Sequence, residues 1–273
     1  GLFWLRDDFR ISKNYGLIEA TLNHDQVVVF YLYKKLTYKY QEAQKWWLSK
    51  SLIYFRKNLE KFNINLEIIE TESFKIFFDK LFKKNDFSFY WNKVYEPDYL
   101  KFDEYLLRNF KNKSISHKIC KGNTLNEINE IKKNDGTPFK VFTPFWRTAE
   151  KYYIEKIPPK EKIIKKCFKS KSYFKDSIDP KEILPNENWF KNLENLWLPN
   201  EENALKELRN FIKNKIKNYS DSRNFPNIIG TSKLSPFIKF GQIHVETIWK
   251  ECEKIKPKNL GIKKFLAEIG WRE

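Results

Sequence analysis

Glu268 and Trp271 are the residues whose types and spacing best suit chemistry on a flat substrate. They are three residues apart, so a helix would place them side by side on one face. An aromatic ring such as this indole can stack on a planar ligand or a base. The ordinary alternative is a core tryptophan beside a surface acid. The spacing alone leaves both interpretations open.

Ser235 and Pro236 form a second candidate, because a serine followed by proline is typical of an N-cap and first helical residue. The free N–H groups and the dipole at a helix start favour an anion. Thr231 and Ser232 add hydroxyl donors close by in the sequence. This pattern predicts an anion-binding helix start, and the alternative is a plain capped helix.

Tyr219 and Arg223 are four residues apart and would share a face if their segment is helical. The ordinary interpretation of that arginine is a solvated surface charge. Arg6, Asp7 and Asp8 follow an apolar run at 2–5 and favour an ion-paired strand end.

The elements that must position these residues alternate along the first half of the chain. Apolar, β-branched or aromatic runs predict strands, and segments of near-helical periodicity lie between them. This alternation predicts an α/β fold with a doubly wound, mainly parallel sheet, whose ligands sit at the carboxyl ends of the strands. The expected strands are 27–32, 66–69, 87–91 and 117–120, and the expected helices are 43–59, 74–84 and 98–112.

The pattern changes near residue 134. Residues 151–199 carry scattered prolines and many lysines with weak periodicity, which is typical of a connector lying over a surface. From 201 onward, apolar residues recur with a helical period. We therefore expect an α/β domain at 1–130, a linker at 131–199 and the start of an all-α domain at 200–273.

The composition points to a polyanionic partner. The formal net charge is +17 and the chain contains 9 Trp, 14 Tyr and 24 Phe. Positive charge attracts nucleic acid, and aromatic rings can stack on bases. The alternative is a lysine-rich solvated surface around an aromatic core, so the charge alone does not establish DNA binding.

Several classes are disfavoured. The three cysteines, Cys120, Cys167 and Cys252, are far apart, which argues against a disulfide framework or a zinc site and favours a reducing, cytoplasmic location. With only 8 Gly and neither a GxGxxG nor a GxxxxGK[ST] motif, an ordinary dinucleotide or P-loop cradle is not expected. We expect no membrane span and no signal peptide.

Four segments together carry a family resemblance. They are WLRDDFR at 4–10, TPFW at 143–146, GTSKLSP at 230–236 and EIGWRE at 268–273. In this order and spacing they resemble motifs of the DNA photolyase and cryptochrome family, and most closely those of a class I cyclobutane pyrimidine dimer photolyase. The resemblance covers the whole chain but only the N-terminal part of a typical member, so we expect the second half of the flavin domain to be missing.

The resemblance implies a flavin enzyme that repairs DNA with blue light. Lys233 stands where an arginine is more usual, and Phe265 where some members carry a tryptophan. The implied FAD contacts are Tyr219, Thr231, Ser232, Lys233, Leu234, Ser235 and Phe265. The implied contacts to damaged DNA are Arg223, Glu268, Trp271 and Arg272, with Glu268 and Trp271 also catalytic.

The family also implies an antenna chromophore, methenyltetrahydrofolate or a deazaflavin, near Asn92, Tyr95 and Glu96. We expect a monomer acting on DNA that contains pyrimidine dimers. Two alternatives stay open: a cryptochrome-type blue-light photoreceptor, and a truncated, cofactor-free fragment that is inactive.

Overall fold

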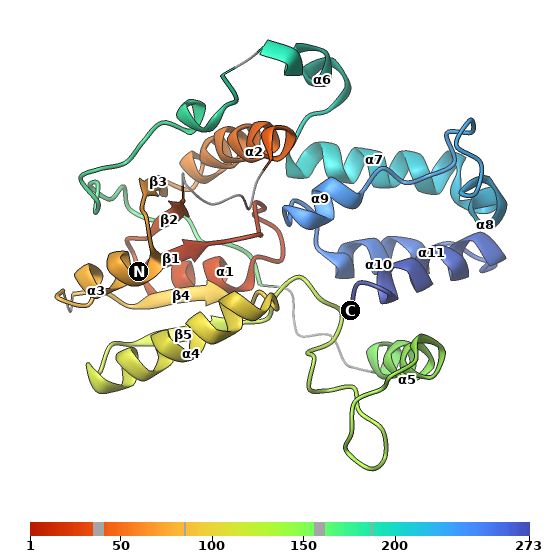
Figure 1. Cartoon of the computed structure of the whole chain (residues 1–273), viewed down its shortest axis with the longest axis horizontal. Coiled ribbons are helices and arrows are strands. Elements are labelled where there is room, and N and C mark those ends of the chain that lie inside the picture. The colour runs from red at the N-terminus through yellow and green to blue at the C-terminus, as the bar shows by residue number, and fades with distance from the viewer. Residues whose placement is uncertain (35–40, 85, 156–161, 187) are drawn as a thin grey trace. The chain divides into compact units, whose positions relative to one another are not determined.

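The computed structural model describes residues 1–34, 41–84, 86–155, 162–186 and 188–273. The chain forms two compact units (Figure 1), which are treated separately below. The first unit comprises residues 1–122, 162–201 and 239–242, and the second comprises 123–161, 202–238 and 243–273. The segment expected to be a linker is thus divided between the two units.

A five-stranded parallel sheet forms the centre of the first unit, which confirms the predicted fold class. The strand order is β3-β2-β1-β4-β5, so the order reverses at β1. Strands β1, β2 and β4 are buried along their whole length because they are almost continuously apolar, whereas the edge strand β5 is exposed at its first two residues. The strands are β1 (Leu2–Leu5), β2 (Val28–Tyr33), β3 (Asn65–Glu70), β4 (Phe89–Asn92) and β5 (His117–Cys120).

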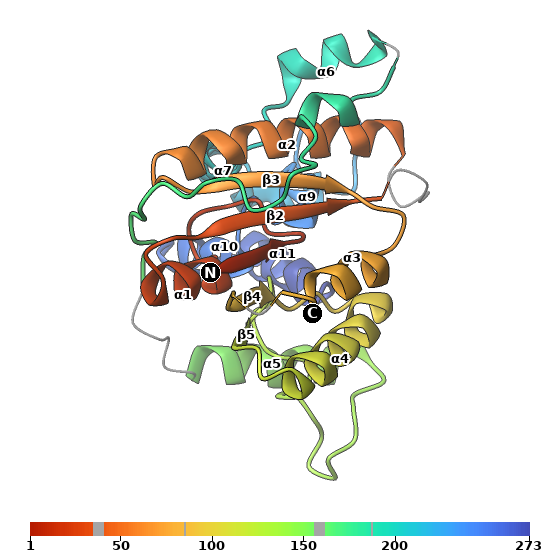
Figure 2. The same cartoon turned by 90° about the vertical axis from the view of Figure 1, so that its left-hand side faces the viewer.

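Helices cover both faces of this sheet (Figure 2). The face that carries Phe3 is covered by α1 (Tyr15–Asn23) and α2 (Glu42–Glu60), and the face that carries Trp4 by α3 (Phe74–Leu81) and α4 (Pro97–Asn112). The sequence pattern predicted α2, α3 and α4 but not α1. Helix α1 is short and contains Gly16, whose missing side chain lets the helix approach β4 and the ring of Phe3.

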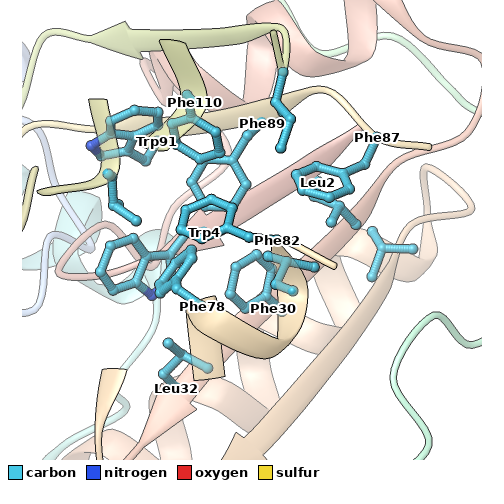
Figure 3. Packing of buried hydrophobic residues seen from close by; sticks show 14 of the residues in the cluster. Leu2, Trp4, Phe30, Leu32, Phe78, Phe82, Phe87, Phe89, Trp91 and Phe110 are labelled. Carbon is cyan, nitrogen blue, oxygen red and sulfur yellow. The ribbon is translucent and has the colours of Figure 1, made fainter. Parts of the chain in front are cut away.

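An aromatic cluster fills the space between the sheet and helices α3 and α4 (Figure 3). The rings of Trp4 and Phe78 are 5.1 Å apart at their centroids, and those of Phe89 and Phe110 are 5.0 Å apart. Tilted and edge-on pairs of this kind add about 0.5–1.5 kcal/mol each beyond the area they bury. Much of the high aromatic content of the chain therefore builds this core and is not available for stacking on a ligand.

Within the first unit, the described residues 162–186 and 188–199 form an irregular strap. Backbone bonds join Phe168 N to the Asp25 carbonyl at 2.7 Å and Ile178 N to the Ile68 carbonyl at 2.8 Å. The buried carboxylate of Glu67 accepts bonds from the backbone N–H groups of Tyr173 and Phe174 at 2.9 and 2.7 Å. Because β3 is an edge strand, the strap covers groups that would otherwise be open to another chain. The strap contains η1 (Pro180–Ile183), η2 (Asn188–Phe190) and α6 (Lys191–Leu196).

The second unit is helical, as the periodicity after residue 201 predicts. Ala204, Leu208 and Phe211 are buried along one face of a single helix, α7 (Glu201–Asn214). Its elements are α5 (Phe142–Glu155), α7 (Glu201–Asn214), η3 (Ile216–Asn218), α8 (Tyr219–Ser222), α9 (Ser235–Lys239), α10 (Val245–Glu253) and α11 (Leu260–Gly270). Within the described part of the chain, no helix is long and apolar enough to cross a membrane.

Candidate functional site

Helix α11 positions Glu268 and Trp271. It begins at a cap in which the Asn259 side chain accepts a bond from Ile262 N at 3.0 Å. Its apolar face is buried in the second unit and includes Ile262, Phe265, Leu266 and Ile269. Trp271 keeps helical backbone angles just past the last turn, and its N–H donates to the Ala267 carbonyl at 3.0 Å. The two candidate residues therefore lie near the end of one helix, as their spacing predicts.

Arg223 lies beside Glu268. Its Nη1 is 2.5 Å from Glu268 Oε1, and both side chains are about three-quarters buried. The guanidinium also lies over the ring of Tyr219, 5.3 Å from its centroid. The ion pair with Glu268 raises the pKa of Arg223, so the guanidinium stays charged throughout the ordinary pH range. Lys264 is a second, more distant cation, with its Nζ 3.7 Å from the same oxygen.

Trp271 is exposed, yet one face of its ring is covered. The residue is 64% exposed, and its ring stacks on Phe142 of α5 with centroids 3.8 Å apart and planes inclined by 8°. Since Phe142 covers one face, the exposure must come from the opposite face and the edges of the indole. This arrangement leaves one flat surface open to a planar ligand, next to Glu268.

The two residues after Trp271 hold the end of α11 in place. Arg272 Nη1 donates to the Asn123 carbonyl. The carboxylate of Glu273 accepts bonds from Leu125 N at 2.7 Å and from Asn126 N at 3.1 Å. The resemblance implies that Arg272 contacts DNA. One nitrogen of its guanidinium is already hydrogen-bonded within the second unit.

Three of the expected flavin contacts are packed inside the second unit. The ring of Phe265 lies 4.6 Å from that of Phe211 and 5.4 Å from that of Tyr219. Leu234 is also buried. Burial raises the pKa of the Tyr219 hydroxyl. These three side chains are therefore held within the helical packing, and the polar candidates lie in the loop before α9.

The loop before α9 leaves most of its polar side chains exposed to solvent. Thr231, Lys233 and Ser235 are exposed, and Ser232 Oγ accepts a weak bond from Leu234 N at 3.3 Å. Lys233 has a φ of 58°, a left-handed conformation that turns the chain sharply. The Leu234 carbonyl accepts from Ile238 N at 2.9 Å, so α9 begins at Ser235 itself. Placing Ser235 as the N-cap was therefore wrong by one residue.

Asn92 is a structural residue at the end of β4. Its Nδ2 donates to Asp8 Oδ2 at 2.5 Å and to Asn14 Oδ1 at 2.7 Å, and its Oδ1 accepts from Gly16 N at 2.7 Å. Both ends of this buried amide are used within the first unit. The burial of Asp8 raises the pKa of that carboxyl, against the lowering effects of Arg10 and of the hydrogen bonds from the Arg6 backbone N–H and from Asn92.

A cavity of about 450 Å³ lies at the carboxyl ends of the strands in the first unit. Of the three residues expected near an antenna, Glu96 lines it, whereas Tyr95 and Asn92 do not. The other residues that line the cavity were not predicted, although the rule that ligands bind at the carboxyl edge of a parallel sheet could have indicated them. The lining residues are Tyr31, Leu32, Tyr33, Lys34, Ser73, Phe74, Lys75, Glu96, Asp98, Tyr99 and Phe102.

A buried arginine supports one wall of this cavity. Arg6 forms a bidentate ion pair with Asp103 of α4, which confirms the expected ion-paired strand end. Its guanidinium carbon also lies 4.0 Å from the ring centroid of Trp4 and 4.9 Å from that of Tyr99. Because a bidentate pair fixes the orientation of α4 at this point, it also fixes where Tyr99 stands in the cavity wall.

Among the described residues, no cluster of histidine, cysteine and carboxylate side chains could hold a metal ion. The three cysteines are free and buried. Burial raises the pKa of Cys120 to about 11 and that of Cys252 to about 12, so these thiols are poor nucleophiles.

Comparison with known proteins identifies the family. The sequence profile described as DNA photolyase matches residues 1–162. The deoxyribodipyrimidine photo-lyase of Agrobacterium fabrum is 28% identical over all of this chain and 57% of its own length. Cryptochrome-2 of Arabidopsis thaliana is 26% identical over 93% of this chain and 43% of its own length. The chain thus spans little more than half of the length of the photolyase relative.

The fold agrees with a solved photolyase. The crystal structure of a bacterial class III photolyase from Agrobacterium tumefaciens matches with a TM-score of 0.87 and 28% identity, and the match covers 99% of this chain and 57% of that one. The expected assignment to class I is therefore not supported by this similarity. The chain belongs to the DNA photolyase family.

Proposed function

We propose that the protein is a deoxyribodipyrimidine photolyase, which uses blue light and reduced FAD to split cyclobutane pyrimidine dimers in DNA. The observation that carries the proposal is the pairing of Glu268 with the exposed ring of Trp271 at the end of one helix, each held by a neighbour. The named photolyase relative, which covers the whole chain, supports it.

The residues of the second unit fit part of FAD. Thr231, Lys233 and Ser235 present two hydroxyls and a cation in an exposed loop, a donor set that suits a diphosphate. Tyr219 and Phe265, whose rings pack together, would supply the apolar contacts. The chemistry that FAD supplies when bound is light-driven transfer of an electron to the dimer.

The protein's own residues bind and orient the damaged bases. A dimer must leave the duplex to reach an enzyme site, and the open face of Trp271 would accept it by stacking. Stacking of this kind contributes about 1–3 kcal/mol per base. The Glu268 carboxyl would hydrogen-bond to the polar edge of the dimer, and Arg223 holds that carboxyl in position. The net charge of +17 would attract the DNA backbone.

The cavity in the first unit is the candidate antenna site. Its volume of about 450 Å³ suits a small planar cofactor. Aromatic rings from Phe74, Tyr99 and Phe102 line it beside charged groups, a lining that suits methenyltetrahydrofolate or a deazaflavin. Ser73→Phe places a large ring in the lining of the cavity and should abolish the binding of either chromophore, measured by absorbance after gel filtration. Retention of a chromophore by this variant would place the antenna elsewhere.

A cryptochrome-type photoreceptor is the second candidate, because Cryptochrome-2 of Arabidopsis thaliana matches 93% of the chain. The two candidates differ in their preference for damaged DNA. Repair predicts tighter binding to an oligonucleotide with a thymine dimer than to the undamaged sequence, and signalling predicts no such preference.

The decisive experiment is a light-dependent repair assay. The chain, FAD and a reductant are mixed with an oligonucleotide that contains one thymine dimer, and blue light is compared with darkness. We expect repair in the light only. Absence of both repair and preferential binding to the dimer would refute the proposal.

As part of the same proposal, the protein acts as a monomer in the cytoplasm, which suits its free cysteines.

A further inference from the structure

A row of nearly parallel rings supports Trp271 from inside the second unit. Phe142 stacks on Trp271 at 3.8 Å, and Trp146, one turn further along α5, lies 6.2 Å from Phe142 with its plane inclined by only 7°. Trp146 in turn meets the edge of the buried Trp249 at 5.9 Å. The exposed ring of Trp271 is thus connected to the core through Phe142 and Trp146.

Gly270 makes room for this row. A side-chain carbon at position 270 would overlap the ring of Trp146, so only glycine lets that ring lie against the end of α11. The contact places α5 close enough for Phe142 to reach Trp271. Residues from two separate helices, together with the missing side chain of Gly270, therefore define the plane of the Trp271 ring.

This arrangement limits what Trp271 can do with a base. Side chains that intercalate between stacked bases need both of their faces free. No base can enter between two rings that are 3.8 Å apart, so Trp271 can accept a ring on one face only. A single-faced platform suits a base or dimer that has already left the stack, and it disfavours insertion into an intact strand.

We propose that Phe142 is a positioning residue that makes Trp271 a one-sided stacking platform, and so adds to the preference for extruded, dimer-containing DNA over stacked, undamaged DNA. The inference rests on the proposed function. Phe142 acts through Trp271 and does not itself contact the substrate.

The test compares two affinities for each variant: that for an oligonucleotide with one thymine dimer and that for the same sequence undamaged. Phe142→Ala should lower the ratio of the affinity for dimer-containing DNA to that for undamaged DNA by about 2- to 13-fold. This is the range expected for the loss of one aromatic pair. Phe142→Tyr keeps the stacked ring and should restore the ratio. Phe145→Ala is the matched control, because Phe145 lies on the same helix and pairs with Phe139 and Phe142.

A double variant shows whether Phe142 acts through Trp271. In a Trp271→Ala background, Phe142→Ala should have no further effect on the ratio. An equal fall in both backgrounds, or no fall in either, would overturn the proposal. If Trp271→Ala itself leaves the ratio unchanged, then the proposed function fails, and this outcome is distinct from a failure of Phe142 alone.

A second measurement does not depend on DNA. The fluorescence of Trp271 is obtained as the difference between each chain and its Trp271→Phe counterpart, and acrylamide quenching reports how much of the ring is accessible. Phe142→Ala should increase the quenching, and Phe142→Tyr should leave it unchanged. Equal quenching in all three chains would mean that Phe142 does not cover the ring, which also overturns the proposal.

Discussion

Arg223 and Glu268 form an ion pair in the second unit, with Arg223 Nη1 2.5 Å from Glu268 Oε1. The family resemblance implies that both residues contact DNA, but it did not relate one to the other. Since the pair leaves part of each side chain exposed, the arginine can orient the carboxylate while both remain accessible to a ligand.

Arg223→Ala should affect damage recognition more than stability. About a quarter of each side chain is exposed, which weakens the pair by solvent screening, so the free energy of unfolding should fall by on the order of 1 kcal/mol. The affinity for dimer-containing DNA should fall more than that for undamaged DNA, because Glu268 loses its orientation. Arg209→Ala removes an exposed positive charge from α7 and is the control for the general attraction of DNA to positive charge. Equal losses in the two variants would mean that Arg223 contributes charge alone.

Two glycines with positive φ should respond very differently to alanine. Gly241 has a φ of 63°, and a side chain there would overlap the Asp7 carbonyl. Gly136 has a φ of 78°, and nothing lies within 4 Å of the position of its missing side chain. Gly136→Ala should cost about 1 kcal/mol from its backbone conformation alone. Gly241→Ala should lower the thermal midpoint by clearly more, because it adds a steric clash. Similar midpoints would contradict the close approach at Gly241.

Glu67 should hold the strap in place within the first unit. Its carboxylate accepts two backbone N–H bonds, and bonds to a charged group contribute about 1.5–3 kcal/mol each. Glu67→Ala should therefore release the strap locally and speed tryptic cleavage at the exposed lysines 169, 171 and 175. Glu72→Ala, at an exposed position just beyond β3, should leave the rate unchanged. An unaltered cleavage pattern for Glu67→Ala would show that other contacts hold the strap.

Glu19 should make stability depend on acid pH. Its carboxylate bonds to Lys118 Nζ at 2.7 Å and to Lys162 Nζ at 2.8 Å, and these bonds lower its pKa below the ordinary value of 4.5. A lowered folded-state pKa gives stabilisation that is present above about pH 4.5 and is lost as the pH falls through the folded-state pKa. Glu19→Gln should therefore be less stable than the parent at pH 7, and the two should converge in acid.

The measurement is the thermal midpoint between pH 7 and pH 3. Glu60→Gln removes the same charge at an exposed position at the end of α2 and should track the parent chain. A constant gap between Glu19→Gln and the parent across this range would show that the contacts of Glu19 do not depend on its charge.

The elements of the fold could be read from the sequence where local pattern decides them. The apolar, β-branched run ending at Leu32 predicts a buried strand, and it forms β2. The spacing of Glu268 and Trp271 predicts their proximity, since neighbours on a helix are fixed by its 3.6-residue period. Helix α1 was missed because its stability comes from Asn14 and from packing around Gly16, neither of which produces a periodic signal.

The sequence by itself determined the alternation of strands and helices, the aromatic core and the residue types at the end of α11. Only the tertiary structure decided which partners the candidate residues meet: Arg223 beside Glu268, Phe142 against Trp271, and Asn92 bonded to Asp8. The physical reason is that a local pattern fixes the direction of a side chain within its own element. Its partner depends on the register between elements that are distant in the chain, and packing and hydrogen bonding set that register only when the chain has folded.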